Sequence, residues 1–172
     1  MAQNFREQGN DCFRAGRAKY PDAIAYYTKA IDTDCNDTSI MEACLANRAA
    51  CNLELKNYGR VLSDCSKCLK INPQNIKAWY RSAKALFALD KLVETIDCCD
   101  HALQVDAENK PIQDIRQQAS KRKAIIDEKI RQKEEREERE RNKKQILENA
   151  FKVEINILRR KKHVIDPIHI GT

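Results

Sequence analysis

Two stretches of the chain repeat each other at a constant separation of 34 residues. The first is marked by Leu45, Ala49, Leu55, Tyr58, Cys65, Cys68 and Pro73, which align in order with Trp79, Ala83, Leu89, Leu92, Cys99, Ala102 and Ala107. A less regular earlier copy is marked by Phe5, Gly9, Ala23, Tyr27, Ala30 and Cys35. A unit of this length cannot bury its apolar face alone, so a stack of similar units is expected.

The pattern of large and small residues within the period is typical of tetratricopeptide repeats, in which each unit is a pair of antiparallel helices. Gly9, Ala49 and Ala83 are small, which lets the first helix of each pair approach the second closely. The chain contains only 4 Gly and 4 Pro, which argues against a sandwich or a barrel. We therefore predict an all-α fold of three tetratricopeptide repeats in a right-handed superhelix with a long C-terminal capping helix.

The predicted organisation has three regions. Residues 1–107 form the repeat module, with repeats at about 2–35, 39–73 and 75–107. Residues 108–158 form a long charged helix that caps the module and projects from it, and residues 159–172 form a basic tail. Charge supports this division, because residues 1–107 hold 14 Lys and Arg against 14 Asp and Glu. Residues 108–172 hold 18 against 12 and so carry the whole net charge of +6.

Several helix starts are marked by residues that satisfy free backbone N–H groups. Ser39 followed by Glu42 three residues later is typical of a capping box, which predicts Ser39 as an N-cap. Other predicted N-caps are Asn57, Asn75 and Asn109, and the prolines expected in first turns are Pro21 and Pro111.

The predicted long helix changes character along its length. Its first part carries an apolar stripe that we expect to cap the third repeat, namely Ile112, Ile115, Ala119, Ile126 and Ile130. Its middle, residues 131–145, lacks apolar side chains and offers the acid-first pairs Glu135–Arg139, Glu137–Arg141 and Glu140–Lys144. Its end presents an apolar face formed by Ile146, Leu147, Ala150, Phe151, Ile155 and Leu158, followed by the basic run of residues 159–162. That face predicts a partner, and the alternatives are another domain, a second copy, a client or nucleic acid.

The 8 cysteines raise the question of a zinc site, because Cys65 and Cys68 are three residues apart and Cys98 is next to Cys99. Cys65, Cys68 and Cys99 occupy repeat positions that call for a small packing residue, as do Cys12, Cys35 and Cys51. We therefore predict buried reduced thiols, with no metal and no cofactor. With no signal peptide and no apolar run long enough for a membrane span, the expected location is the cytoplasm, with the nucleus as an alternative.

A candidate binding site lies on the first helix of each repeat. Arg6 and Asn10 are four residues apart and share a face, and so do Lys77 and Arg81. Asn47 is the polar residue expected to point inward from the helix between them. All five side chains donate hydrogen bonds and none is acidic, which favours a carboxylate ligand, or two carboxylates close together as in a chain that ends in Asp. The alternative is a set of solvated helix faces. Apolar walls one turn further along would be Phe13, Leu53, the aliphatic stem of Lys84, and Phe87.

These five residues resemble, position by position, the two-carboxylate clamp of tetratricopeptide co-chaperones. The matching stretches are residues 4–11, 45–51, 53–58 and 71–78. The resemblance implies that the site binds the Glu-Glu-Val-Asp terminus of heat-shock protein 90, and also that of cytosolic heat-shock protein 70. Arg6 departs from the pattern, because the clamp usually has Lys there, and Arg is planar and longer. The four-residue extension before the second repeat and the long final helix resemble the cyclophilin seven suppressor and tetratricopeptide repeat domain protein four subfamily. Its members continue into a further domain, so the chain is expected to be an N-terminal fragment.

The sequence leaves three classes of function to consider. The first is a non-catalytic co-chaperone adaptor that docks on chaperone C-termini and assists clients. The second is a nucleic-acid- or ribosome-associated module that acts through the basic C-terminal helix. The third is an enzyme, and it is rejected because His101, His163 and His169 are scattered and no phosphate loop or catalytic triad is present. The neutral module with a basic site favours the adaptor.

Overall fold

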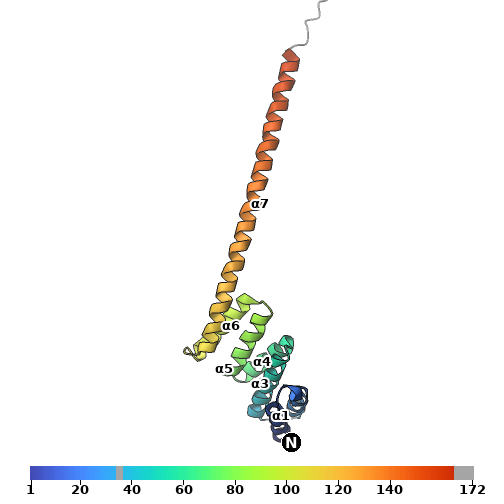
Figure 1. Cartoon of the computed structure of the whole chain (residues 1–172), viewed down its shortest axis with the longest axis vertical. Coiled ribbons are helices and arrows are strands. Elements are labelled where there is room, and N and C mark those ends of the chain that lie inside the picture. Colours follow the sequence, from blue (N-terminus) through green and yellow to red (C-terminus); the bar gives the residue numbers. More distant parts are fainter. Residues whose placement is uncertain (34–36, 165–172) are drawn as a thin grey trace, which may run out of the picture. The chain divides into compact units, whose positions relative to one another are not determined.

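The computed structural model describes residues 1–33 and 37–164, with side chains up to Lys161. The elements, in chain order, are α1 (Ala2–Arg14), the 3-10 turn η1 (Arg17–Lys19), α2 (Tyr20–Asp32), α3 (Thr38–Glu54), α4 (Tyr58–Ile71), α5 (Ile76–Ala88), α6 (Leu92–Val105) and α7 (Lys110–Val164) (Figure 1). All elements of the described residues are helical, which confirms the predicted all-α class.

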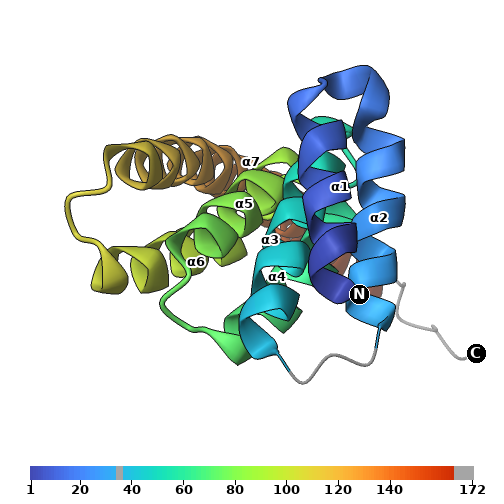
Figure 2. The same ribbon diagram turned by 90° about the horizontal axis from the view of Figure 1, so that it is seen from below.

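Three antiparallel helix pairs follow one another in the unit Met1–Ala124. α1 packs against α2, α3 against α4, and α5 against α6. Successive pairs meet because α2 also contacts α3, and α4 also contacts α5. The first helices form their own row, since α1 contacts α3 and α3 contacts α5 (Figure 2). This arrangement confirms the predicted stack of three helical pairs.

Small side chains and cysteines make up much of the core. Cys44 and Cys51 are fully buried with Ala23, Tyr27 and Ala30 in the cluster of the first pair. The other buried cysteines are Cys65, Cys68, Cys98 and Cys99, while Cys12 is half-buried. Burial raises the pKa of Cys65 and Cys68 to about 11, so both thiols are protonated at neutral pH. The packing role is confirmed for these buried cysteines, and Cys35 lies outside the described residues.

One buried ion pair joins the second helix pair internally. Arg48 on α3 donates from Nε and Nη2 to the two carboxylate oxygens of Asp64 on α4, at 2.9 and 2.6 Å. Its Nη1 donates to the Thr28 hydroxyl of α2 at 2.9 Å, so the guanidinium also ties the first pair to the second. The Asp64 side chain is only 6% exposed, so this pair is shielded from water.

The helix starts show one wrong prediction. The N-cap of α3 is Asp37, whose carboxylate accepts from the backbone N–H groups of Ser39 and Ile40. Glu42, the other half of the predicted capping box, instead accepts from the side-chain amides of Asn72 and Asn75, at 2.8 and 2.6 Å. The capping box does not form because the Asp37 carboxylate already accepts from the first backbone N–H groups, and because Glu42 accepts from amides distant in the chain.

Two of the other three predicted asparagine caps form their capping hydrogen bonds and one does not. Asn75 accepts from the Ala78 N–H at 2.9 Å, and Asn109 accepts from the Ile112 N–H at 3.3 Å, as predicted. Asn57 is the N-cap residue of α4 but its side chain makes no capping bond; its amide nitrogen donates to Asn52 Oδ1. The two prolines lie in the first turns of α2 and α7, as predicted.

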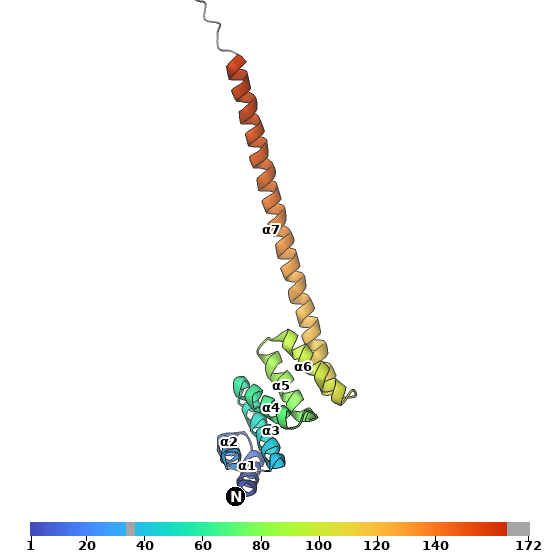
Figure 3. The ribbon, with the colours of Figure 1, turned by 180° about the vertical axis from the view of Figure 1, so that it is seen from behind.

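α7 is one continuous helix whose first part belongs to the unit Met1–Ala124 (Figure 3). Ile112 and Ala119 are fully buried, and Ile115 packs against the cluster of the third helix pair. The predicted stripe therefore caps the third repeat over this part only. Ile126 and Ile130 lie in the second unit and are 37% and 50% exposed.

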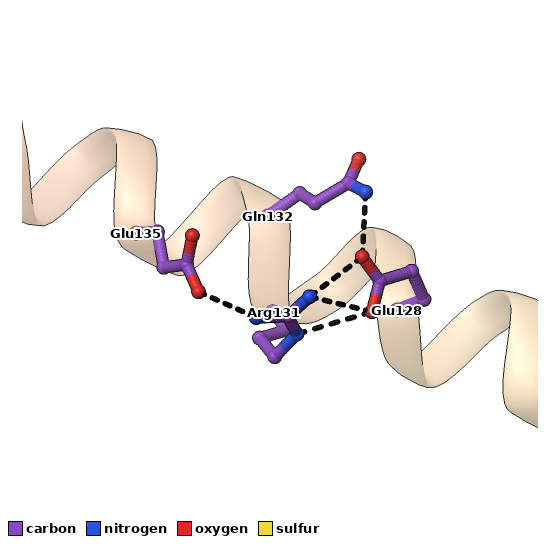
Figure 4. A network of polar contacts seen from close by, with 4 residues as sticks. All are labelled: Glu128, Arg131, Gln132 and Glu135. Atoms are coloured by element: carbon purple, nitrogen blue, oxygen red, sulfur yellow. Dashed lines mark hydrogen bonds and ion pairs between the residues drawn. The ribbon is translucent and has the colours of Figure 1, made fainter.

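The second unit begins at Ile125 and is described through Val164 as a single helix. Arg131 donates to the carboxylates of Glu128 and Glu135, and Gln132 also donates to Glu128 (Figure 4). Ion pairs also join Lys133 to Glu137 and Lys143 to Glu140. The three predicted acid-first pairs are not among those formed by the described side chains. Each of the three acids has more than one base within a helical turn. Glu135 pairs with Arg131, Glu137 with Lys133 and Glu140 with Lys143.

The apolar face near the end of α7 is solvated. Ile146, Leu147, Phe151, Ile155 and Leu158 are all between 46% and 68% exposed. Within the described ranges, no helix combines the length and the apolar character that crossing a bilayer requires.

Candidate functional site

The five predicted site residues lie on the row of first helices. Arg6 and Asn10 stand on α1, Asn47 on α3, and Lys77 and Arg81 on α5. Lys77 is exposed and the other four are half-buried. Since α1 contacts α3 and α3 contacts α5, the three helices that carry these residues are consecutive neighbours (Figure 2).

Asn10 and Asn47 are in direct contact. The Asn47 amide nitrogen donates to Asn10 Oδ1 at 3.0 Å, which joins two residues that are 37 positions apart in the chain. The hydroxyl of Tyr27 on α2 donates to the same oxygen at 2.7 Å. With two donors on its oxygen, Asn10 has its NH₂ group left for another acceptor.

Two arginines have buried nitrogen atoms that form no hydrogen bond. Among the described residues, Arg6 Nε and Arg81 Nη1 are the only buried side-chain N or O atoms without a partner. The large majority of buried side-chain polar atoms in proteins are paired, so each exception needs an explanation. Both exceptions belong to the predicted site.

The surroundings of Arg81 contain thiols instead of carboxylates. Burial lowers the pKa of the Arg81 guanidinium below its ordinary value, although the group stays charged at any physiological pH. The titratable groups whose charges act on it are Cys65, Cys68 and Cys51. Burial raises the pKa of Cys51 to about 11, as it does for the other two, so the thiols are neutral. Arg81 thus presents a positive charge with no countercharge from these neighbours.

The four predicted wall residues are found in separate contacts. Phe13 is 36% exposed and stacks on Tyr20, with ring centroids 5.2 Å apart. Leu53 packs against the core cluster of the second pair. Lys84 places its ammonium 5.4 Å from the centroid of the Tyr80 ring, and Phe87 lies 6.0 Å from the guanidinium carbon of Arg122.

Two pockets of the module lie away from the five residues. One, of about 260 Å³, surrounds the Arg48–Asp64 pair between α2, α3 and α4. The other, of about 590 Å³, is formed by α4, α5 and α6 beside Trp79 and His101. None of the five predicted residues lines either pocket.

Tyr27 belongs to the site but was predicted only as a packing residue. The sequence held a signal, because Cys65 and Cys99 occupy its position in the second and third repeats. A buried tyrosine hydroxyl needs a partner that a cysteine does not need.

The helical pairs and the row of donor side chains define a class. The first tetratricopeptide domain of Spaghetti (RPAP3), solved with the HSP90 peptide SRMEEVD, superposes with a TM-score of 0.63 at 30% identity, over 72% of this chain and 95% of that one. This chain therefore belongs to the tetratricopeptide-repeat family. No protein-family model matches it.

Within that family, the sequence is similar to a co-chaperone subfamily. It is 44% identical to the Hsp70/Hsp90 co-chaperone CNS1 of Saccharomyces cerevisiae over 171 residues, 95% of this chain and 42% of that protein. It is 38% identical to the tetratricopeptide repeat protein 4 homolog of Dictyostelium discoideum over 146 residues, 85% of this chain and 37% of that one. The solved structure of Cns1 superposes with a TM-score of 0.73 at 41% identity, over 88% of this chain and 48% of that one. The predicted subfamily is confirmed, and the chain spans less than half the length of these relatives.

Proposed function

We propose that the chain is a non-catalytic co-chaperone adaptor. Its repeat module binds the acidic Glu-Glu-Val-Asp C-terminus of heat-shock protein 90, and that of heat-shock protein 70, and so brings the chaperone to client proteins. Arg6, Asn10, Asn47, Lys77 and Arg81 together form the carboxylate clamp, and no cofactor takes part.

The two unpartnered guanidinium nitrogens of Arg6 and Arg81 are the observation that carries this proposal. A buried donor left unpaired is unfavourable by about 1–3 kcal/mol, and more if it is charged. A ligand with two carboxylates would offer acceptors to the guanidinium groups of Arg6 on α1 and Arg81 on α5, and the NH₂ group of Asn10 would donate to the same ligand. The relatives support the same ligand, because co-chaperones and a peptide-bound domain are among them.

Arg6 gives this clamp a geometry of its own. A guanidinium donates two parallel hydrogen bonds to one carboxylate, whereas an ammonium acts as a point charge. We expect Arg6→Lys to retain binding but to weaken it.

The penultimate side chains of the peptide would lie against apolar walls. Phe13 and Phe87 each keep part of a ring accessible, and the stem of Lys84 is exposed. Leu53 is half-buried and would contribute only its outer methyl groups. Truncating a wall is expected to affect binding less than truncating a charged clamp residue, because it removes apolar contact with the peptide and no charge-assisted hydrogen bond.

The test is the binding of a fluorescein-labelled peptide ending in Glu-Glu-Val-Asp, followed by fluorescence anisotropy. Loss of one charge-assisted hydrogen bond corresponds to about 1.5–3 kcal/mol, so Lys77→Ala or Arg81→Ala should weaken binding about 10- to 150-fold. Lys67→Ala, an exposed lysine on α4, is the matched control and should bind like wild type. Wild-type affinity in both clamp variants, with unchanged circular dichroism, would refute the proposed site.

A further inference from the structure

The first helix pair contains a hydrogen bond from a tyrosine hydroxyl that the other two pairs cannot form, because they have no tyrosine at that position. Tyr27 is fully buried in α2, and its hydroxyl donates to Asn10 Oδ1 at 2.7 Å. Cys65 and Cys99 stand at the corresponding positions of α4 and α6. A thiol is a weak donor and is too short to make the same contact.

Gly9 makes room for this tyrosine. A Cβ atom at Gly9 would lie 2.6 Å from Tyr27 Cε1 and 2.8 Å from Cδ1. The corresponding residues of the other pairs are Ala49 and Ala83, each opposite a cysteine. The first pair therefore has glycine and tyrosine where the other pairs have alanine and cysteine. The tyrosine places a hydroxyl next to Asn10 of α1.

The contact fixes the orientation of the Asn10 amide. Asn10 and Asn47 alone can pair in either direction, because each amide has a donor and an acceptor. The Tyr27 hydroxyl contacts both amides: it donates to Asn10 Oδ1 and also interacts with the Asn47 side chain, and this arrangement favours the direction in which Asn47 donates and the Asn10 oxygen accepts. Burial raises the pKa of Tyr27 well above its ordinary value, so the hydroxyl keeps its proton throughout the physiological range.

We propose that Tyr27 is a positioning residue of the clamp: its hydroxyl holds the Asn10 oxygen inward and turns the Asn10 NH₂ group toward the ligand carboxylate. This inference rests on the proposed function. Without the hydroxyl, the amide also samples the reverse orientation, in which its oxygen faces the carboxylate and repels it. Affinity then falls in proportion to the fraction of molecules in the productive orientation.

The experiment is a calorimetric titration of the 172-residue chain with a peptide ending in Glu-Glu-Val-Asp and with the same peptide amidated at its C-terminus. Tyr27→Phe should weaken binding of the free acid about 3- to 10-fold and leave the weak binding of the amide unchanged. Tyr26→Phe, the neighbouring tyrosine on α2, is the matched control and should bind like wild type. A purely structural role would reduce both affinities together.

Two further variants keep the inference testable if Tyr27→Phe unfolds. Asn10→Asp preserves the acceptor of the Tyr27 hydroxyl but removes the two N–H donors, so it should fold and lose binding of the free acid. In an Asn10→Ala background, Tyr27→Phe should have no further effect on affinity. Wild-type affinity in Asn10→Asp or in Tyr27→Phe would overturn the role of Tyr27, whereas equal wild-type affinities for acid and amide would overturn the proposed function itself.

Discussion

Replacing Gly9 by alanine sets two opposing effects against each other. Alanine in the interior of a helix is more favourable than glycine by about 1 kcal/mol, so local propensity alone predicts stabilisation of α1. The new methyl group, however, would lie 2.6 Å from Tyr27 Cε1 and 2.8 Å from Cδ1, closer than carbon atoms that are not bonded approach each other. Tyr27 is fully buried and cannot move aside without displacing its neighbours.

The structure decides which effect is larger. Overpacking a buried site is unfavourable by about 1–3 kcal/mol. A shifted Tyr27 ring also loses its 2.7 Å hydrogen bond to Asn10, and a buried unpaired hydroxyl adds about 1–3 kcal/mol. After the propensity gain is subtracted, Gly9→Ala should lower the free energy of unfolding by about 1–5 kcal/mol.

Urea unfolding followed by the fluorescence of Trp79, the single tryptophan, measures this change. Gly59→Ala is the matched control, because a Cβ at Gly59 of α4 meets nothing within 4 Å. That control should be as stable as wild type or slightly more stable. If Gly9→Ala were also as stable as wild type, the close packing of Gly9 on Tyr27 would be refuted.

Three other changes have defined outcomes. Asp64→Ala leaves the Arg48 guanidinium, whose side chain is 15% exposed, without a countercharge and should lower the free energy of unfolding by about 3 kcal/mol in urea, the low end for a buried pair; a loss below about 1 kcal/mol would show that the pair is not shielded. Burial raises the pKa of Cys98 to about 12, so the unfolded chain loses this proton first as the pH rises above the ordinary thiol value near 9. Stability should therefore fall there, more steeply in wild type than in Cys98→Ala; equal slopes in thermal melts would contradict this. Truncation after Lys144 should leave the affinity for the acidic peptide unchanged in calorimetry, and a large loss would place the binding site on α7.

The repeat period was sufficient to predict the helix pairs and the burial of the cysteines. Both depend on local spacing, because a period of 34 residues returns the same side chains to the same interfaces. The candidate binding row was predicted from residues four apart on the first helices and its role as a clamp from a resemblance; the contact between Asn10 and Asn47 agrees with the predicted row.

The errors concern polar contacts between residues far apart in the chain. Glu42 was assigned to a local capping box, but Asn72 and Asn75 bind its carboxylate across 30 and 33 positions. The Tyr27–Asn10 contact was missed for the same reason. A side chain with several possible partners is assigned by tertiary geometry, which no local pattern contains.

The capping stripe was predicted too long. Periodicity continues through Ile126 and Ile130, but burial ends within the first unit. An apolar pattern indicates which side of a helix could pack and says nothing about how far a partner extends. Sequence also could not select among the ion pairs of the charged stretch, because Glu135, Glu137 and Glu140 each have more than one base within a helical turn.

Nuclear magnetic resonance of the side-chain amides would test most directly whether α1, α3 and α5 carry one carboxylate site. Addition of a peptide ending in Glu-Glu-Val-Asp should shift the NH₂ signals of Asn10 and Asn47 and the guanidinium signal of Arg81, while Asn142 on α7 stays unchanged. The amidated peptide should leave all of them in place. Shifts confined to α7, or to the pocket beside Trp79 and His101, would contradict the account.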